Sequence, residues 1–238
     1  MFTGEAVAHE YASRKLSGQD DGEFRAVIGS PVDSSRRPTN LAISALTIRH
    51  DRSSGDARVL LHWRDPAKVG HAGGLYQVIP VGIFQPASDH SWNEQNDFSL
   101  WRCLLREFAE ELLGQAEPDA THGPIDYATW PFAVRLDAER RAGTIRAYCL
   151  GIRVDPLTLA TDLISVVVID APVFDEIFGG LVEANAEGIL PASGSDGAPG
   201  APFVESEVER LTRRSPMQAA GAAAIASAWM HRSKLLAQ

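Results

Sequence analysis

Three glutamates, Glu107, Glu110 and Glu111, have the types and spacing in this 238-residue chain that best suit metal chemistry. Residues three and four positions apart share one side of a helix, so a helix would present all three carboxylates together. On a bare helix such like charges cost about 0.2 to 0.5 kcal/mol per pair, and a cation among them reverses the sign. Carboxylate oxygens suit Mg²⁺ or Mn²⁺. The trio therefore predicts a divalent-metal site.

A solvated surface is the competing interpretation of the same residues. Glutamate is a good helix former, and an REFAEE string on a surface helix is commonly a solvated face stabilised by neighbouring arginine. The helix alone favours this second interpretation. The prediction of a metal site therefore depends on the elements that surround the helix.

The glutamates lie in the strongest helical pattern of the sequence. Asp97 or Ser99 is a suitable N-cap and Gly114 a natural stop, which predicts a helix at 97–113. The apolar side chains that recur at three- to four-residue spacing are Leu100 or Trp101, Leu104, Leu105, Phe108 and Leu112. This stripe faces the core and leaves the other side to the carboxylates.

Strand patterns precede this helix. The apolar runs at 41–50 and 57–64 are separated by the turn-forming DRSSGD, which predicts a hairpin. A third apolar segment at 75–86 contains Pro80 and Gly82, which indicate a bend near its end. The loop QPASDHSWNEQND then leads to the helix.

Both strands and helices are expected after it. The predicted strands are 127–136 and 144–154, joined by the charged turn DAERRAG, and the buried strand 163–170. The predicted helices are 173–186, 204–214 and the alanine-rich 217–237. Helices flanking a mixed sheet give an α/β fold, an α/β/α sandwich.

The domain organisation follows from composition. Residues 1–40 read as an N-terminal arm and 41–190 as the domain that contains the glutamate trio. The Gly-, Pro- and Ala-rich 191–203 reads as a flexible linker or loop, and 204–238 as a C-terminal helical extension.

Bulk composition excludes several classes of partner. A net charge of −9 and a pI near 5.2 argue against nucleic acid, whose partners generally carry a basic face. No apolar run approaches the ~20 residues needed to span a bilayer, and the N-terminus lacks the order of a secretory signal. We expect a cytoplasmic protein with no membrane partner, in which Cys103 and Cys149 are reduced thiols and Cys103 has no catalytic role.

The segment from Arg106 to Glu111 resembles the second half of the Nudix box, R-E-U-x-E-E, where U is bulky and apolar and Phe108 takes that place. Gly82, in IPVGIFQP, resembles the glycine that opens the box, and the strands at 41–64 resemble those that precede it. Roughly residues 41–170 fit the family's plan.

The resemblance implies Mg²⁺-dependent hydrolysis of a nucleoside diphosphate derivative, such as a nucleotide-sugar, a dinucleotide or a modified nucleotide. It makes the three glutamates metal ligands and gives Arg106 the role of orienting them through an ion pair. The general base stays open among the three glutamates and three acids from later loops, namely Asp162, Asp170 and Glu183.

The chain departs from the family pattern in three places. About a dozen extra residues separate Gly82 from the helix, and Phe98 stands eight residues before Arg106, where the family has a glutamate. Asp97 and Glu94 are nearby acids out of register. Gly114 follows one position late.

Other side chains are candidates for substrate contact. His62, Arg64 and Lys68 flank the strand and loop that approach the substrate in Nudix proteins, so they could bind phosphate, although exposed strand edges carry such residues anyway. Four aromatic residues are candidates for stacking on a base, although an aromatic beside a strand is more often core: Trp63, Tyr76, Phe84 and Trp92.

Two other functions compete with hydrolysis. A Nudix-like domain with a decayed box could sense its ligand without cleaving it, as the missing upstream glutamate suggests. Alternatively, the alanine-rich C-terminal helix could dock on a partner or on a second copy of the chain as a homodimer.

Overall fold

Strand β1 (Leu41–His50) is the centre of the fold, because three strands pair with it. It runs parallel to β7 (Thr161–Asp170), from Leu41 opposite Thr161 to His50 opposite Asp170. The computed structural model describes residues 10, 12–19, 27–37, 39–69, 72–156, 158–181, 188–189 and 199–237. The hairpin predicted after β1 is confirmed, since β1 and β2 (Ala57–Val59) pair antiparallel.

The remaining strands complete one mixed sheet and one small sheet. In the large sheet, β6 (Ile145–Val154) pairs with β7, β5 (Val81–Ile83) pairs with the first half of β1, and β9 (Ala201–Pro202) pairs with β2. The small sheet has the order β4-β3-β8, and its strands are Tyr76–Val78, Leu61–Arg64 and Gly188–Ile189. The predicted bend at Pro80 is the break between β4 and β5.

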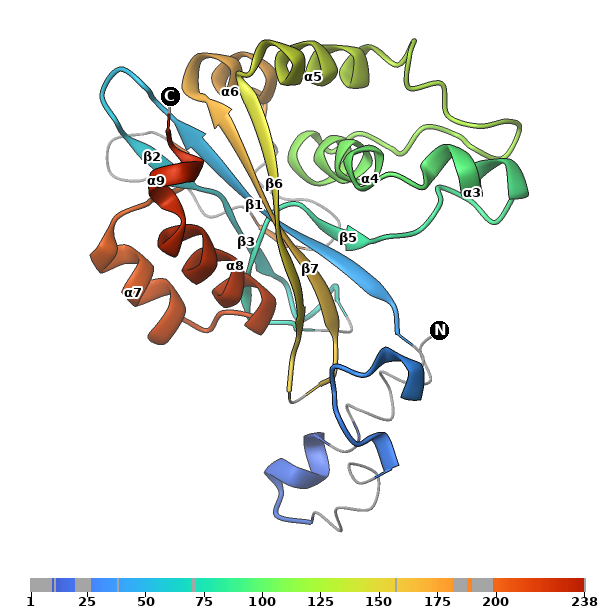
Figure 1. Cartoon of the computed structure of the whole chain (residues 1–238), viewed down its shortest axis with the longest axis vertical. Coiled ribbons are helices and arrows are strands. Elements are labelled where there is room, and N and C mark those ends of the chain that lie inside the picture. The colour runs from blue at the N-terminus through green and yellow to red at the C-terminus, as the bar shows by residue number, and fades with distance from the viewer. Residues whose placement is uncertain are drawn as a thin grey trace.

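Helices cover both faces of the large sheet, which makes the fold an α/β/α sandwich as predicted (Figure 1). One layer consists of α4 (Leu100–Glu107), the π-helical turn η2 (Phe108–Leu112), α5 (Pro131–Ala142) and α6 (Ala171–Phe178). The other consists of α7 (Glu205–Arg213), α8 (Ala219–Met230) and α9 (Arg232–Leu235).

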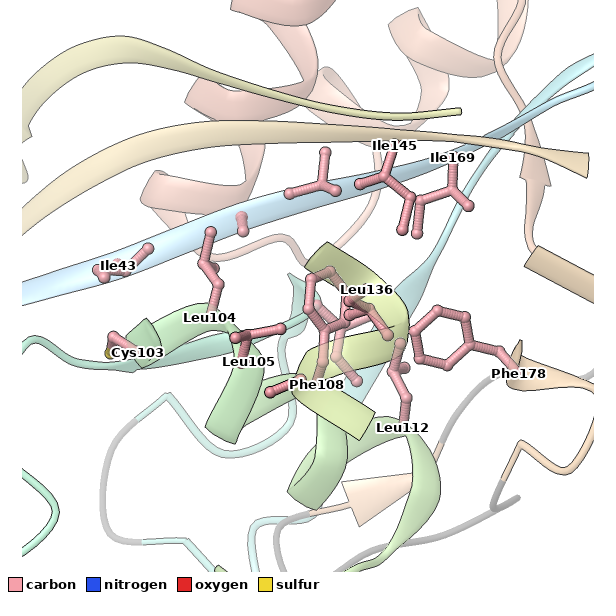
Figure 2. Packing of buried hydrophobic residues seen from close by; sticks show 14 of the residues in the cluster. Ile43, Cys103, Leu104, Leu105, Phe108, Leu112, Leu136, Ile145, Ile169 and Phe178 are labelled. Atoms are coloured by element: carbon pink, nitrogen blue, oxygen red, sulfur yellow. The ribbon is translucent and has the colours of Figure 1, made fainter. Parts of the chain in front are cut away.

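Each helical layer has its own apolar core. On the α4 side, Phe108 and Leu112 pack with Ile43, Ile169 and Phe178 (Figure 2). On the α8 side, the packed residues include Leu46, Ile48, Val166, Ala224 and Ile225. The alternation of β1 side chains between the two cores follows from the two-residue period of a strand.

The strand predicted at 127–136 is wrong, because this segment begins helix α5. Pro131 occupies the first turn and Gly143 ends the helix with a φ of 80°, both common signals at helix termini. The ring of Phe132 packs against the ring of Phe178 in α6, with the two ring centroids 6.2 Å apart. Tertiary packing thus outweighs the strand propensity of the aromatic side chains.

The loop predicted at 85–97 also contains a helix, α3 (Ser91–Asp97). Its buried residues are polar, Asn93 and Asp97, so it lacks the apolar period that reveals a helix in sequence. Asn93 Nδ2 donates instead to Ser88 Oγ at 2.5 Å and to the Ala120 carbonyl at 3.1 Å.

The two terminal regions lie at different places on the sheet. Within the expected N-terminal arm, Arg37 donates to Thr161 Oγ1 at 3.0 Å, beside the start of β7. Residues 191–198 of the expected linker lie outside the described residues, whereas Ala201 and Pro202 pair with β2. Helix α8 forms the second layer on the sheet. None of the helices in the described ranges has the length and apolar character that crossing a bilayer requires.

Candidate functional site

The segment from Phe98 through α4 to the turn η2 lies against residues 81–84, which contain β5, and four contacts join the two segments. The two segments are antiparallel, so residues with increasing numbers on the helix contact residues with decreasing numbers on the strand. We call these four contacts the α4–β5 row. They are Phe98 with Phe84, Cys103 with Ile83, Glu107 with Gly82 and Glu111 with Val81.

The carboxylate of Glu107 lies directly on Gly82. A Cβ built at Gly82 would lie 2.7 Å from Oε2 of Glu107 and closer still to Cδ and Oε1. Real Cβ atoms do not approach other heavy atoms this closely, so any larger residue at position 82 displaces the carboxylate. The Glu107 carboxylate thus occupies the space that a side chain at position 82 would take, and the φ of Gly82 lies outside the region that favours glycine.

Glu111 is held one residue further along β5. Its Oε2 accepts a hydrogen bond from the Val81 N–H at 3.0 Å, and only 5% of the residue is exposed. Glu110 is exposed to solvent. The structure therefore brings Glu107 and Glu111 to adjacent residues of one strand, while Glu110 faces outward on the same turn.

The helix changes from α to π geometry at the glutamates. Helix α4 is capped by Ser99 Oγ, which accepts from the Arg102 N–H at 3.4 Å, and the π turn η2 then runs from Phe108 to Leu112. A π turn is wider than an α turn and accommodates one additional residue. This fits the sequence, in which Gly114 follows one position late, and Gly114 ends the helix with a φ of 62°.

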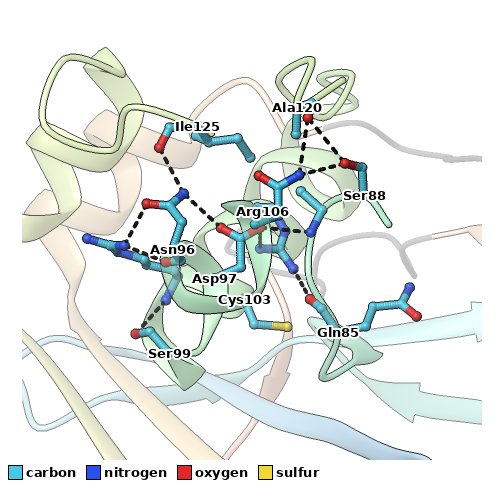
Figure 3. Close-up of polar contacts among 12 residues, drawn as sticks. Gln85, Ser88, Asn96, Asp97, Ser99, Cys103, Arg106, Ala120 and Ile125 are labelled. Atoms are coloured by element: carbon cyan, nitrogen blue, oxygen red, sulfur yellow. Dashed lines mark hydrogen bonds and ion pairs between the residues drawn. The ribbon is translucent and has the colours of Figure 1, made fainter. Parts of the chain in front are cut away.

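The Arg106 side chain is directed into a buried polar network beside α3 (Figure 3). It is 2% exposed, and its Nη2 donates to the Gln85 carbonyl at 2.6 Å. Its Nη1 donates to Tyr127 Oη at 3.1 Å, and its Nε donates to Glu117 Oε1 at 2.9 Å. Arg106 thus fixes α4 to the two loops that flank it.

Asp97 is the acid that faces Arg106 at the end of α3. Its Oδ2 lies 3.6 Å from Arg106 Nη1 and accepts from the Ala87 N–H at 2.8 Å. Its Oδ1 accepts from Tyr127 Oη at 2.9 Å and from Asn96 Nδ2 at 3.1 Å. Asp97 was not among the predicted site residues, because it is one residue away from the position at which the Nudix box has its upstream glutamate. The helix α3, which the sequence did not reveal, is what turns it toward Arg106.

Cys103 lies in the middle of the row, and its thiol is unreactive. Its thiol contacts the Ile83 carbonyl at 3.6 Å and the residue is fully buried. Burial, and secondarily the charge of Glu107, raise the pKa of this thiol to about 12. A thiol with such a pKa is almost entirely protonated at neutral pH, and the protonated thiol is a poor nucleophile.

The predicted phosphate contacts lie in the other sheet. His62 and Arg64 belong to β3, and His62 is 2% exposed while Arg64 is half-buried. Lys68 is exposed in the loop that follows. These residues are thus on a different strand pair from Gly82 and the glutamates.

The later acids considered as general bases are placed apart from the row. Asp162 accepts a hydrogen bond from Ser44 Oγ at 2.8 Å. It is two residues before Ile164 on β7, so its side chain points to the same face as Ile164, the face that α8 covers. Asp170 lies opposite His50 at the far end of β1, roughly 20 Å along the strand from the residues that pair with β5. Glu183 lies outside the described residues.

The donor set around Gly82 fits a magnesium ion that is shared with a substrate. Across the described residues, no group of three or more histidine, cysteine, aspartate or glutamate side chains is already arranged as a metal site. Mg²⁺ commonly takes one or two carboxylates and completes its shell with substrate phosphates and water. Glu107 and Glu111 are the two carboxylates that would be available to such an ion.

Comparison with known proteins adds little to this geometry. No family model and no curated protein matches the chain. Among solved structures, a crystal structure of a NUDIX hydrolase from Alicyclobacillus acidocaldarius is similar with 16% identity and a TM-score of 0.39, covering 79% of this chain and 90% of that one. The candidate site therefore rests on its own residues.

Proposed function

We propose that this chain is a Mg²⁺-dependent hydrolase of the diphosphate bond in a nucleoside diphosphate derivative. The observation that supports it is the position of the Glu107 carboxylate on Gly82, with Glu111 held on the neighbouring Val81 N–H. On a solvated helix face both carboxylates would point to water, whereas Glu107 and Glu111 are turned toward β5. The resemblance of REFAEE to the Nudix box supports the same assignment.

In this proposal Glu107 and Glu111 hold the ion, and Glu110, exposed on the same turn, becomes the third ligand by turning its side chain toward them. When bound, the metal would neutralise the diphosphate oxygens and acidify a water molecule. The reaction adds water across the P–O–P linkage and leaves two phosphate products.

The chain's own contribution is to hold the carboxylates in place. The Val81 N–H fixes the orientation of Glu111, and the missing side chain of Gly82 leaves room for Glu107. Arg106 and Asp97 act as positioning residues, because Arg106, in the last turn of α4, and Asp97, at the end of α3, both bind the loop that follows β5. Preorganisation of this kind lowers the cost of binding a charged substrate.

The test is a screen of nucleoside diphosphate derivatives with Mg²⁺ or Mn²⁺, with the products resolved by chromatography. We expect turnover that disappears with a chelator and falls at least about 100-fold in Glu111→Gln, because even supporting residues of metal sites are commonly worth 10- to 100-fold. Equal turnover in wild type and in the Glu107→Gln, Glu111→Gln double variant would refute the proposal.

A ligand-sensing role is the second candidate, favoured by the phenylalanine at position 98 where the Nudix box has a glutamate. In that case the same screen shows no product for any compound. A nucleoside diphosphate would still raise the melting temperature of the wild type with Mg²⁺.

A further inference from the structure

Phe98 presents an aromatic ring to solvent at one end of the α4–β5 row. The residue is 81% exposed, although it stands in a fixed position between the end of α3 and Ser99, which caps α4. Its ring lies 5.5 Å from the ring of Phe84 at an angle of 47°. An apolar side chain of this size, held out on two helix termini, is available to a ligand.

Phe84 connects this ring to the carboxylates. Its N–H donates to the Leu41 carbonyl at 2.8 Å, so the backbone pairing of β5 with β1 continues through it. Side chains two residues apart on a strand point to the same face, so Phe84 and the Cβ direction of Gly82 share the face on which Glu107 lies.

The spacing of the row suits a nucleotide. Two residues of strand span about 6.8 Å. Phe98 lies across the row from Phe84, with ring centroids 5.5 Å apart, as Glu107 lies across it from Gly82, so its ring is on the order of 10 Å from the Glu107 carboxylate. A diphosphate at the carboxylates would therefore bring the attached nucleoside to the aromatic end.

We propose that Phe98, supported by Phe84, is the surface on which the base of the nucleoside diphosphate stacks. This inference rests on the proposed function, because it places the diphosphate at Glu107 and Glu111. A planar base suits an exposed ring, since stacking on an aromatic side chain needs no directional hydrogen bonds and tolerates different bases. The subsite thus selects for nucleosides over other diphosphate esters.

Trp92 offers a matched control. It is a second exposed aromatic residue on the neighbouring helix α3, 44% exposed. Its ring is already stacked on His90 at 4.4 Å, and its Nε1 donates to the Ala120 carbonyl at 3.3 Å. Because Trp92 lies off the α4–β5 row, its replacement is expected to leave nucleotide binding unchanged.

The experiment is calorimetric titration of ADP and of inorganic pyrophosphate, each with Mg²⁺, into the wild type and four variants, Phe98→Ala, Phe98→Tyr, Trp92→Ala and Glu111→Gln. In Phe98→Ala we expect about tenfold weaker ADP binding and unchanged pyrophosphate binding, since one stacked base is commonly worth a factor of this size. Phe98→Tyr keeps the ring and should bind ADP as the wild type does. Trp92→Ala should match the wild type with both ligands.

The outcomes separate this inference from the proposed function. Equal ADP affinity in wild type and Phe98→Ala, with weaker binding of both ligands in Glu111→Gln, would overturn the stacking surface and keep the diphosphate site. Equal weakening of ADP and pyrophosphate in Phe98→Ala would also overturn it, because the ring would then act on the diphosphate end. Failure of the wild type to bind either ligand would overturn both.

Discussion

The carboxylate of Asp97 lies 3.6 Å from the guanidinium of Arg106, and the two side chains are 0% and 2% exposed. Two charges removed from water in this way are costly unless their remaining hydrogen-bonding groups are satisfied. Here they are satisfied by Ala87, Tyr127 and the Gln85 carbonyl. The pair thus joins α3, α4 and the loop after β5 into one unit at the edge of the candidate site.

Removal of Asp97 is expected to destabilise the protein strongly. Asp97→Ala leaves the Arg106 charge and the Ala87 N–H buried without this partner, for which losses of about 3 to 5 kcal/mol are usual. Glu117→Ala removes the other acid of Arg106, which is 39% exposed and screened, so we expect about 1 kcal/mol or less. Urea denaturation measures both, and equal losses in the two variants would contradict the prediction.

Gly82→Ala is expected to damage function more than stability. The added methyl group meets the flexible end of Glu107, which can swing away, so the fold should survive while the carboxylate loses its position. We expect metal-dependent turnover at least about tenfold lower and a melting temperature within a few degrees of the wild type. Gly123→Ala is the control, because a Cβ there meets nothing within 4 Å.

The two cysteines should differ in their reaction with thiol reagents. Cys149 is exposed, whereas Cys103 is buried and burial raises its pKa to about 12. At pH 7.5 we expect iodoacetamide to modify one thiol per native chain and two after unfolding in urea, as counted by mass spectrometry. Modification of Cys103 in the native protein would show that the α4–β5 row opens readily.

His50 should make stability fall as the pH drops below neutrality. The residue is 5% exposed, and burial followed by the charge of Arg146 lowers its pKa from the ordinary 6.5. The unfolded chain therefore takes up a proton at a higher pH than the folded protein. Stability is full above about pH 6.5 and declines as the pH falls from there toward the folded pKa.

Urea titrations at pH 7.5 and 5.5 test this dependence. His50→Gln should lose less stability between the two values than the wild type does, whatever its absolute stability. Parallel losses in both proteins would assign the pH dependence to other groups.

The sequence predicted the strands β1, β6 and β7 and the glutamate helix, because these elements carry strong apolar periods or β-branched runs. It did not predict α3, whose buried residues are polar, or α5, whose aromatic residues resemble a strand until their packing on α6 is known. Signals for α5 were nevertheless present in Pro131 and Gly143.

The candidate site was predictable only where its residues form a local pattern. The spacing of Glu107, Glu110 and Glu111 is local, so a helix and three carboxylates could be read directly. The roles of Asp97 and Phe98 depend on a turn between two helices that no local pattern shows. For the π turn, in which Glu111 is buried and Glu110 exposed, the single sign in the sequence is Gly114, one position later than in the Nudix box.

The parallel pairing of β1 with β7 has a consequence for synthesis of the chain. Leu41 and its partner Thr161 are separated by 161 − 41 = 120 residues, so at about 5 to 20 residues per second β1 leaves the ribosome roughly 6 to 24 seconds before β7. During that interval one apolar edge of β1 has no native neighbour. We therefore expect nascent chains stalled between these strands to be the aggregation-prone species and the ones that recruit chaperones.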